Sequence, residues 1–336
     1  MSMAEALRVT RRIKEPKNLS ARIEWLRSYY FEGARRAWNN EFTAWTTGTD
    51  WDVLFDEMTF YIVPETYPFL QTFGSSIKQA ARPVMLHPDF WTWSLPERKA
   101  WFVREVMVNH VPQEVLPGEL ICGARFNVQT STCWTRKEAG ERNRLVHGKN
   151  GVRAAMKWFH DHGYGNSGAT SGHLIPGYER VLKIGWKGLY EEIEQGFQTL
   201  SPREKRGRKG SQLKAMMTAA TMPRDLAARY AALCDKLAAQ ETVFVRKAEL
   251  KQMAANLVRV PWEPARTFWE AVQALWLTHM LIMSDENYPG PGVSFGRIDQ
   301  YLLPYWQRSM DEGMDREFGK EIMKCFWVHA LSLIHI

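Results

Sequence analysis

The sequence has few of the features that decide a protein class quickly. Its 336 residues include only four cysteines, none spaced as C-x-x-C, which argues against a disulfide scaffold and a zinc ribbon. No apolar run approaches ~20 residues, so we expect no membrane-spanning segment. The charged N-terminus has no apolar core of the kind that signal peptides carry, and no internal repeat is visible. We therefore expect a reduced, cytoplasmic protein.

The composition is that of a globular protein with a large interior. Hydrophobic residues make up 45% of the chain and charged residues 24%, with fifteen tryptophans. The net charge of +7 is partly local, because residues 202–209 read PREKRGRK. We interpret this segment as a solvated loop rather than a nucleic-acid contact, because no aromatic stacking platform accompanies it. A non-catalytic helical scaffold or RNA-binding protein is the alternative class that this loop leaves open.

The spacing of apolar residues predicts a mainly helical chain without a marked domain boundary. A Ser94-Leu-Pro-Glu97 sequence predicts a capped helix start, and Pro117-Gly118 predicts a turn that leads into a short strand at Leu120–Cys122. A further extended piece is expected around residues 60–63. The expected helices cover residues 21–38, 95–109, 152–161, 188–200, 210–222, 223–256 and 268–283.

The chain is organised around residues 267–328. Thr267 and Glu270 form a possible capping box, and residues 268–283 are apolar nearly all round, which predicts a buried helix. This helix ends in a turn rich in proline and glycine that presents Glu286, Asn287 and Tyr288. The turn is either a wall of a binding site or an ordinary polar loop.

A second stretch, residues 160–178, is rich in glycine and histidine and has three interpretations. Gly163, Gly165 and Gly168 spell G-x-G-x-x-G, but a dinucleotide loop needs a strand before it and a helix directly after it. Histidines could bind zinc or iron, although neither H-x3-H nor H-E-x-x-H spacing occurs. The third interpretation is a substrate loop, in which glycines allow close approach of the backbone and one histidine faces the ligand. The histidines concerned are His147, His160, His162 and His173.

Four motifs in order carry a resemblance to a known family. The chain resembles the glycyl radical enzymes of the pyruvate formate-lyase type. These have a G-R-x-D-Q-[YH]-[LM]-x-P-[YF] segment, a following E-L-[LI]-x-C-[LF]-W-[VI] helix, a G-H-x-x-P-[DG]-Y-x-[KR]-V-L segment, in which Gly177 stands where aspartate is common, and a G-[DE]-L-I-x-G turn. The matching residues are Gly296, Arg297, Asp299, Gln300, Tyr301, Pro304 and Tyr305; Glu321, Cys325, Phe326, Trp327 and Val328; Gly172, His173, Pro176, Tyr178, Arg180, Val181 and Leu182; and Gly118, Glu119, Leu120, Ile121 and Gly123.

The resemblance implies both a fold and a substrate site. It implies that residues 1–336 form the N-terminal, mainly helical part of a ten-stranded α/β barrel of the pyruvate formate-lyase-like kind. His173 would face a small-molecule substrate, and Arg297 with Asp299 would form a structural pair rather than a carboxylate clamp. The expected substrate-binding residues are His173, Tyr164, Asn166, Glu286, Asn287 and Tyr288.

The resemblance also implies radical chemistry whose central residues are not found in this sequence. The family stores a glycyl radical, installed by a radical-SAM activating enzyme, and passes it to a catalytic cysteine. Neither the G-C context of that cysteine nor the R-V-x-G-Y glycyl loop occurs here. We therefore expect an inactive fragment without the C-terminal glycyl radical domain, with no bound cofactor or metal, from a protein that forms a homodimer. Decarboxylation of an arylacetate is the favoured reaction, and a dehydratase or a C–S or C–N lyase is the alternative.

Overall fold

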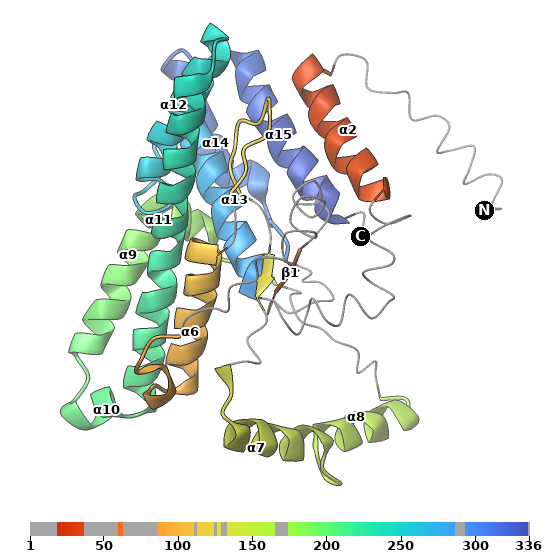
Figure 1. Cartoon of the computed structure of the whole chain (residues 1–336), viewed down its shortest axis with the longest axis vertical. Helices are drawn as coiled ribbons and strands as arrows, with labels where there is room; N and C mark the ends of the chain where they lie inside the picture. The colour runs from red at the N-terminus through yellow and green to blue at the C-terminus, as the bar shows by residue number, and fades with distance from the viewer. Residues whose placement is uncertain are drawn as a thin grey trace, which may run out of the picture.

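The computed structural model describes most of the C-terminal two thirds of the chain and parts of the remainder (Figure 1). The described residues are 19–36, 60–62, 86–110, 113–123, 126–128, 133–164, 174–285 and 293–334. Their elements are α2 (Ala21–Arg36), β1 (Phe60–Ile62), η3 (Phe90–Thr92), α6 (Leu95–Glu105), η4 (Val106–His110), β2 (Phe126–Val128), α7 (Arg136–His147), α8 (Val152–Asp161), α9 (Tyr178–Gln198), α10 (Pro202–Arg206), α11 (Arg208–Gln240), α12 (Phe244–Arg259), α13 (Phe268–Asp285), α14 (Ile298–Asp311) and α15 (Arg316–Ile334).

The helices pack around two hydrophobic clusters that α13 joins. One cluster lies between α6, α11 and α12, and the other lies between α2, α13, α14 and α15. Leu277 and Leu281 of α13 belong to the first cluster, whereas Val272 and Trp276 belong to the second. The apolar character of this helix on all sides is thus explained, because both of its faces are covered.

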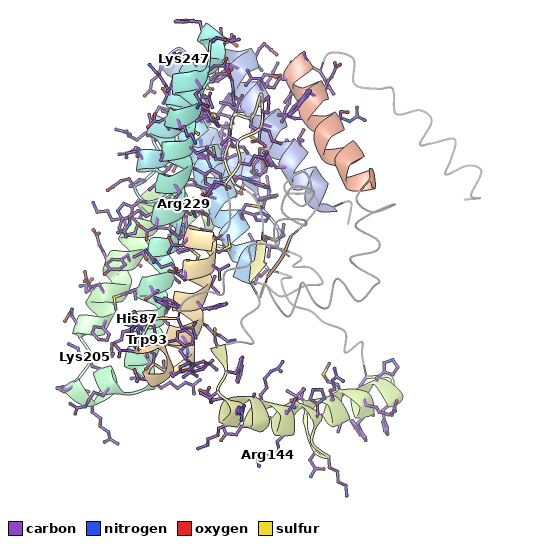
Figure 2. All side chains as sticks on the ribbon, in the orientation of Figure 1. His87, Trp93, Arg144, Lys205, Arg229 and Lys247 are labelled. Carbon is purple, nitrogen blue, oxygen red and sulfur yellow. The ribbon has the colours of Figure 1, made fainter. Side chains whose placement is uncertain are left out.

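Helices α7 and α8 lie apart from this body (Figure 1). Neither helix contains a buried residue, and Arg144 of α7 lies well away from the other helices (Figure 2). The N-terminus of α7 is nevertheless anchored, because the buried Arg98 of α6 donates to the carboxylate of Glu138 at 2.7 and 2.5 Å. A capping box between Thr135 and Glu138 starts the helix.

Strands are short in the part of the chain that the structure describes. Residues Phe60–Ile62 pair antiparallel with Phe126–Val128, with Tyr61 opposite Asn127. The extended piece expected around residues 60–63 is confirmed, and so is the mainly helical character. The ten-stranded barrel stays a prediction, since among the described residues the sheet consists of β1 and β2 alone.

Several expected helices have the predicted boundaries, but others differ. The helix expected at 188–200 begins at Tyr178, and the continuous helix expected at 223–256 is wrong, because α11 ends at Gln240 and α12 begins at Phe244. The Ser94–Glu97 capping box is present, and α6 continues through one π-helical turn to His110. The expected break at Pro223 is wrong: Pro223 lies buried inside α11, where packing against neighbouring helices outweighs the lost backbone hydrogen bond.

The basic segment 202–209 also differs from the prediction, because it is not simply a loop. Ser201 caps α10 by accepting from the amide of Glu204, and the Glu204 carboxylate accepts from Lys209 at 2.7 Å. Part of the positive charge that suggested a nucleic-acid contact is therefore neutralised within the segment.

Helix α9 contains a conformational break at Gly185. This glycine has φ +68, and the next two amides donate outside the helix, Trp186 to Pro261 at 3.0 Å and Lys187 to Trp262 at 2.9 Å. A Cβ atom at position 185 would lie 2.1 Å from the Trp262 carbonyl oxygen. Only glycine permits the connection between α12 and α13 to approach α9 so closely.

Candidate functional site

Helix α13 is the element from which the candidate site is built. The hydroxyl of Thr267 accepts from the Glu270 amide at 3.2 Å, as the capping pattern predicts. The Glu270 carboxylate, however, accepts from the Arg266 amide at 2.7 Å rather than from Thr267, so half of the predicted capping box is found. Residues 268–281 are buried except Trp269, which is partly buried.

Three polar side chains on one face of α13 bind the backbone of the segment 120–123. Trp269 Nε1 donates to the Leu120 carbonyl at 2.6 Å, and Trp276 Nε1 donates to the Gly123 carbonyl at 3.0 Å. Between them, the Gln273 amide accepts from Cys122 N and donates to Cys122 O, both at 2.8 Å. The predicted strand at Leu120–Cys122 is thus wrong, because helix side chains at i, i+4 and i+7 satisfy the backbone groups that a neighbouring strand would otherwise pair.

The turn that precedes this segment is fixed by Glu119. Its carboxylate accepts from the Leu116 amide at 2.7 Å and lies 3.2 Å from His329 Nε2 of α15. Both side chains are buried. The predicted turn at Pro117-Gly118 is confirmed, with Gly118 at φ +86. Buried ionisable groups of this kind hold α15 and the turn in one arrangement.

An isolated parallel bridge joins the two stretches that sequence analysis singled out. Leu174 pairs with Val293, and the Ser294 amide donates to the Leu174 carbonyl at 3.0 Å. Leu174 directly follows His173, and Val293 directly follows residues 286–292, for which the sequence predicts a turn. The backbone beside the predicted histidine and the backbone beside the predicted acidic turn therefore lie next to each other.

A buried aromatic pair lies close to this bridge in the chain. The Tyr178 hydroxyl is 2.6 Å from His279 Nδ1, and the His279 ring lies 4.2 Å from that of Phe295. Burial, together with nearby Tyr301, raises the pKa of the Tyr178 phenol. The phenol therefore stays protonated and can donate to Nδ1. The contacts tie α9, α13 and the chain after Val293 together.

The G-R-x-D-Q motif leads into helix α14, with Arg297 at its N-cap. Gly296 has φ +64, and a Cβ atom there would lie 2.8 Å from Cγ2 of Ile175. Arg297 donates to the Asp299 carboxylate at 3.1 and 2.9 Å, and both side chains are exposed. The contact joins two exposed side chains of the same short segment, so a structural role for the pair stays a prediction. The glycine allows close contact with Ile175.

The six predicted substrate-binding residues are only partly within the described residues. Tyr164 is 70% exposed, and its ring stacks with Trp158 and His162 at the end of α8. The other five positions lie outside the described residues; these are Asn166, His173, Glu286, Asn287 and Tyr288. Their assignment stays a prediction.

The three described histidines of the proposed metal site do not converge on one point. His147, His160 and His162 are exposed, and His162 Nδ1 contacts the Trp158 carbonyl at 2.7 Å. No group of three potential ligands converges in the described ranges, which do not include His173. The dinucleotide interpretation concerns Gly163, Gly165 and Gly168, of which only Gly163 is described, and α8 precedes it where a strand is required.

All four cysteines are buried in the core. Cys122 and Cys234 sulfurs lie 3.6 Å apart, and burial raises the pKa of the Cys122 thiol, with a further contribution from Cys234. Burial likewise raises the pKa of Cys325 to about 12. Such thiols remain protonated and unreactive at neutral pH, and Cys325 is fully buried in the core.

Sequence reasoning missed Gln273 and His279, which organise this region. The signal was present, because both are polar residues inside an otherwise apolar helix pattern, and a buried polar group needs a partner. Their partners, Cys122 and Tyr178 respectively, lie about a hundred residues or more away in sequence.

None of the described helices is long and apolar enough to cross a membrane.

The helical arrangement is that of solved glycyl radical enzymes. Hydroxyproline dehydratase from Clostridioides difficile matches with a TM-score of 0.62 at 18% identity, over 95% of this chain and 41% of that chain. The B12-independent glycerol dehydratase from Clostridium butyricum matches with a TM-score of 0.58 at 19% identity, over 96% of this chain and 40% of that chain. At these identities the likeness defines the fold class.

The particular family follows from the sequence match. A family model described as pyruvate formate lyase-like matches residues 128–335. The chain belongs to the pyruvate formate lyase-like family, which confirms the resemblance inferred from the four motifs.

Relatives with assigned activities differ in the reactions that their names give. An isethionate sulfite-lyase of Oleidesulfovibrio alaskensis is 37% identical over 196 residues, which are 57% of this chain and 22% of the relative. An indoleacetate decarboxylase of Tractidigestivibacter scatoligenes is 48% identical over 80 residues, which are 24% of this chain and 9% of the relative. The chain spans about a fifth of the length of the isethionate sulfite-lyases that it matches.

Proposed function

We propose that this chain is the substrate-binding, N-terminal part of a glycyl radical lyase. Its family membership supports this function, as do relatives named as a sulfite-lyase, dehydratases and a decarboxylase. The radical-bearing glycine and the catalytic cysteine would belong to a longer protein. A radical-SAM enzyme would activate that protein, which would act in the cytoplasm as a homodimer.

The reaction that we favour is decarboxylation of an arylacetate. The observation that carries this choice is the 48% identity over 80 residues with an indoleacetate decarboxylase, compared with 37% for the isethionate sulfite-lyase. In such a reaction the substrate loses CO2 and gains a hydrogen at the carbon that carried it. The role of this chain is to bind and orient the substrate.

The proposed pocket has His173 on one wall and Glu286, Asn287 and Tyr288 on the other. The bridge between Leu174 and Val293 supports this arrangement, because His173 is one Cα step, about 3.8 Å, from a residue that pairs beside the turn. An imidazole can donate to a carboxylate or move a proton near neutral pH. Tyr164 and Asn166 would line the same pocket from the glycine-rich stretch.

Carbon–sulfur cleavage is the second candidate reaction. The isethionate sulfite-lyase match extends over 196 residues and 57% of this chain, a longer region than the indoleacetate decarboxylase match. A dehydratase is a further candidate, because a (2S)-3-sulfopropanediol dehydratase of Klebsiella oxytoca is 29% identical over 252 residues.

The decisive experiment compares substrates on the longer protein that this proposal requires. After anaerobic treatment with its activating enzyme, the protein should show a glycyl radical EPR doublet and convert indole-3-acetate to 3-methylindole and CO2. Release of sulfite from isethionate without decarboxylation would replace the first candidate by the second. The 336-residue chain treated in the same way should show neither radical nor turnover, and a doublet on it would contradict the fragment interpretation.

The chain itself can report on the pocket. Indole-3-acetate should shift the amide NMR signals of Leu174 and Val293, which lie beside the proposed pocket. His173→Ala should weaken the binding measured from these two signals by about tenfold, which corresponds to the loss of one charge-assisted hydrogen bond. An exposed histidine on α8 offers the control His160→Ala, which should leave binding unchanged. Equal binding by both variants would overturn the role given to His173.

A further inference from the structure

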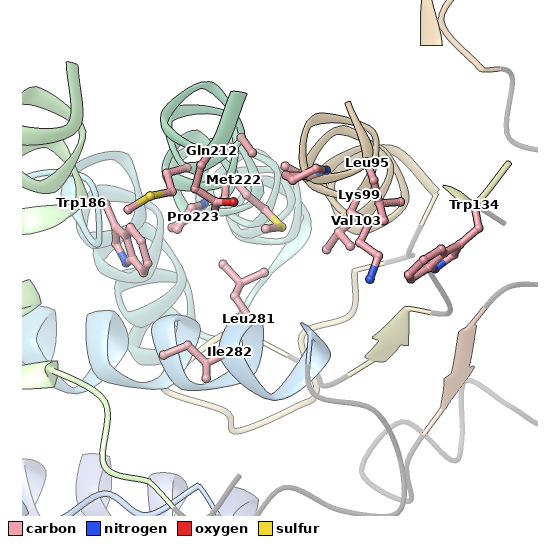
Figure 3. A pocket seen from close by; sticks show the side chains of 15 residues that line it. Leu95, Lys99, Val103, Trp134, Trp186, Gln212, Met222, Pro223, Leu281 and Ile282 are labelled. Atoms are coloured by element: carbon pink, nitrogen blue, oxygen red, sulfur yellow. The ribbon is translucent and has the colours of Figure 1, made fainter. Parts of the chain in front are cut away.

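A groove between α6, α9, α11 and α13 has no part in the function proposed above (Figure 3). Its volume is about 630 Å³, within the range of small-molecule sites. Leu281 and Ile282 of α13 lie along one side, and α6 and α11 lie along the other, with Trp186 and Trp134 toward opposite ends (Figure 3). No lining residue comes from segments 174–178 or 293–296.

The lining is apolar except for two side chains, Lys99 and Gln212. The Lys99 ammonium lies 5.2 Å from the centre of the Trp134 ring. Within the described ranges no carboxylate forms an ion pair with it; the carboxylate two residues earlier, Glu97, is occupied by the amide and hydroxyl of Ser94 at 3.1 and 2.6 Å. A cation without a counter-ion beside an apolar surface favours binding of a negatively charged group.

The two tryptophans add a preference for flat rings. Trp186 is held by a hydrogen bond from its Nε1 to Thr278 Oγ1 at 3.0 Å, so its indole orientation is fixed. Met216 and Met222 of α11 also line the groove, and thioethers adapt to aromatic ligands of different shape. Anchored aromatic and thioether surfaces recognise aromatic rings at little entropic cost.

We propose that this groove binds an aromatic monoanion, a carboxylate or sulfonate carried on one or two fused rings. The anionic group binds Lys99, and the rings lie over Leu281 and Ile282 between the tryptophans. This inference does not depend on the proposed radical function, because it concerns residues of the described helices and is tested by binding alone.

The test uses the purified chain, isothermal titration calorimetry and two probes of equal shape, 2-naphthoate and neutral 2-naphthamide. The naphthoate should bind about fivefold more tightly, as one partly exposed charge pair provides. Lys99→Met should remove this difference by weakening naphthoate alone. Ala219→Trp, which places an indole in the groove, should weaken both probes by at least about tenfold.

Lys157→Met on α8, far from the groove, is the matched control and should leave both affinities unchanged. Circular dichroism establishes that each variant is folded. If Ala219→Trp does not fold, Lys99→Met alone tests the proposal. The proposal is wrong if neither probe binds, or if naphthoate binds Lys99→Met as tightly as the unmodified chain.

Discussion

The Tyr178 hydroxyl lies 2.6 Å from Nδ1 of His279, inside the core and 101 residues away in sequence. The two residues come from α9 and α13, and the ring of Phe295, two residues after Val293, contacts the rings of both. Breaking this contact should therefore affect stability and not only local geometry.

Tyr178→Phe removes the hydroxyl while keeping the ring. We expect the free energy of unfolding to fall by about 1–3 kcal/mol, because a buried hydrogen bond is lost and the imidazole loses that partner. Urea unfolding followed by tryptophan fluorescence measures the change. Tyr164→Phe is the control, since Tyr164 is 70% exposed and should change stability by less than about 0.5 kcal/mol. Equal effects of the two substitutions would show that the contact contributes nothing.

Gln273→Leu tests the attachment of the segment 120–123 to α13. The substitution leaves both backbone groups of Cys122 without their partner, so we expect a loss of about 2–4 kcal/mol. The same exchange at the exposed Gln195 of α9 should lie within about 0.5 kcal/mol of the unmodified chain. The urea midpoints of the two variants are compared with that of the unmodified chain. Similar midpoints for both variants would mean that water takes the place of the Gln273 amide.

Two glycines of α9 should respond in opposite directions to alanine. Gly185→Ala forces a Cβ atom against the Trp262 carbonyl at a positive φ, and we expect a loss of about 2–4 kcal/mol. Gly196→Ala meets nothing within 4 Å, so the higher helix propensity of alanine should stabilise the chain by about 0.5–1 kcal/mol. Thermal unfolding of both variants gives the signs. A Gly185→Ala variant as stable as the unmodified chain would contradict the close approach of α9 to residue 262.

Stability should fall as the pH rises above about 9. Burial raises the pKa of Cys325 to about 12, so the folded chain retains a proton that the unfolded chain releases near its ordinary thiol pKa of about 8.5. The unfolded state then binds fewer protons, and the stabilisation present below pH 8.5 is lost progressively up to about pH 12. The raised pKa values of Cys122 and Tyr178 act in the same direction.

The pH effect is separable from the volume effect of a cysteine substitution. Cys325→Ala should lower stability at every pH, but the further loss between pH 8 and pH 10.5 should be smaller than in the unmodified chain. Urea midpoints at the two pH values provide the comparison. An identical pH-dependent loss in both proteins would exclude Cys325 as a contributor.

Local signals in the sequence predicted helices well where a cap and a periodic apolar face coincide. The Ser94–Glu97 box and the apolar run of α13 are such cases, and their helices were found. The pattern at Ser201-Pro202-x-Glu204 is of the same kind, but its high charge led to the wrong prediction of a loop. Pro223 led to the wrong prediction of a helix break, because the burial of α11 outweighs the local cost of a proline inside the helix.

The sequence suggested where to look for a site but not the contacts around it, and the site residues themselves stay a prediction. Family motifs pointed to His173 and to the turn after α13, and the structure pairs the residues that follow them. The contacts of Gln273 and His279 were not predictable, because each depends on a partner from a distant segment whose position no local pattern specifies. A short apolar segment such as 120–122 has the same sequence pattern whether a neighbouring strand or the side chains of a helix bind its backbone, so the pattern alone does not predict a strand.

The attachment of Cys122 to Gln273 has a consequence for synthesis on the ribosome. The two residues are 151 positions apart, and at roughly 5–20 residues per second the second emerges about 8–30 s after the first. During that interval α6, α11 and α12 can already assemble, while the backbone of residues 120–123 has no helix face to bind. Nascent chains released before α13 should therefore expose this apolar segment to chaperones, and those released after it should not.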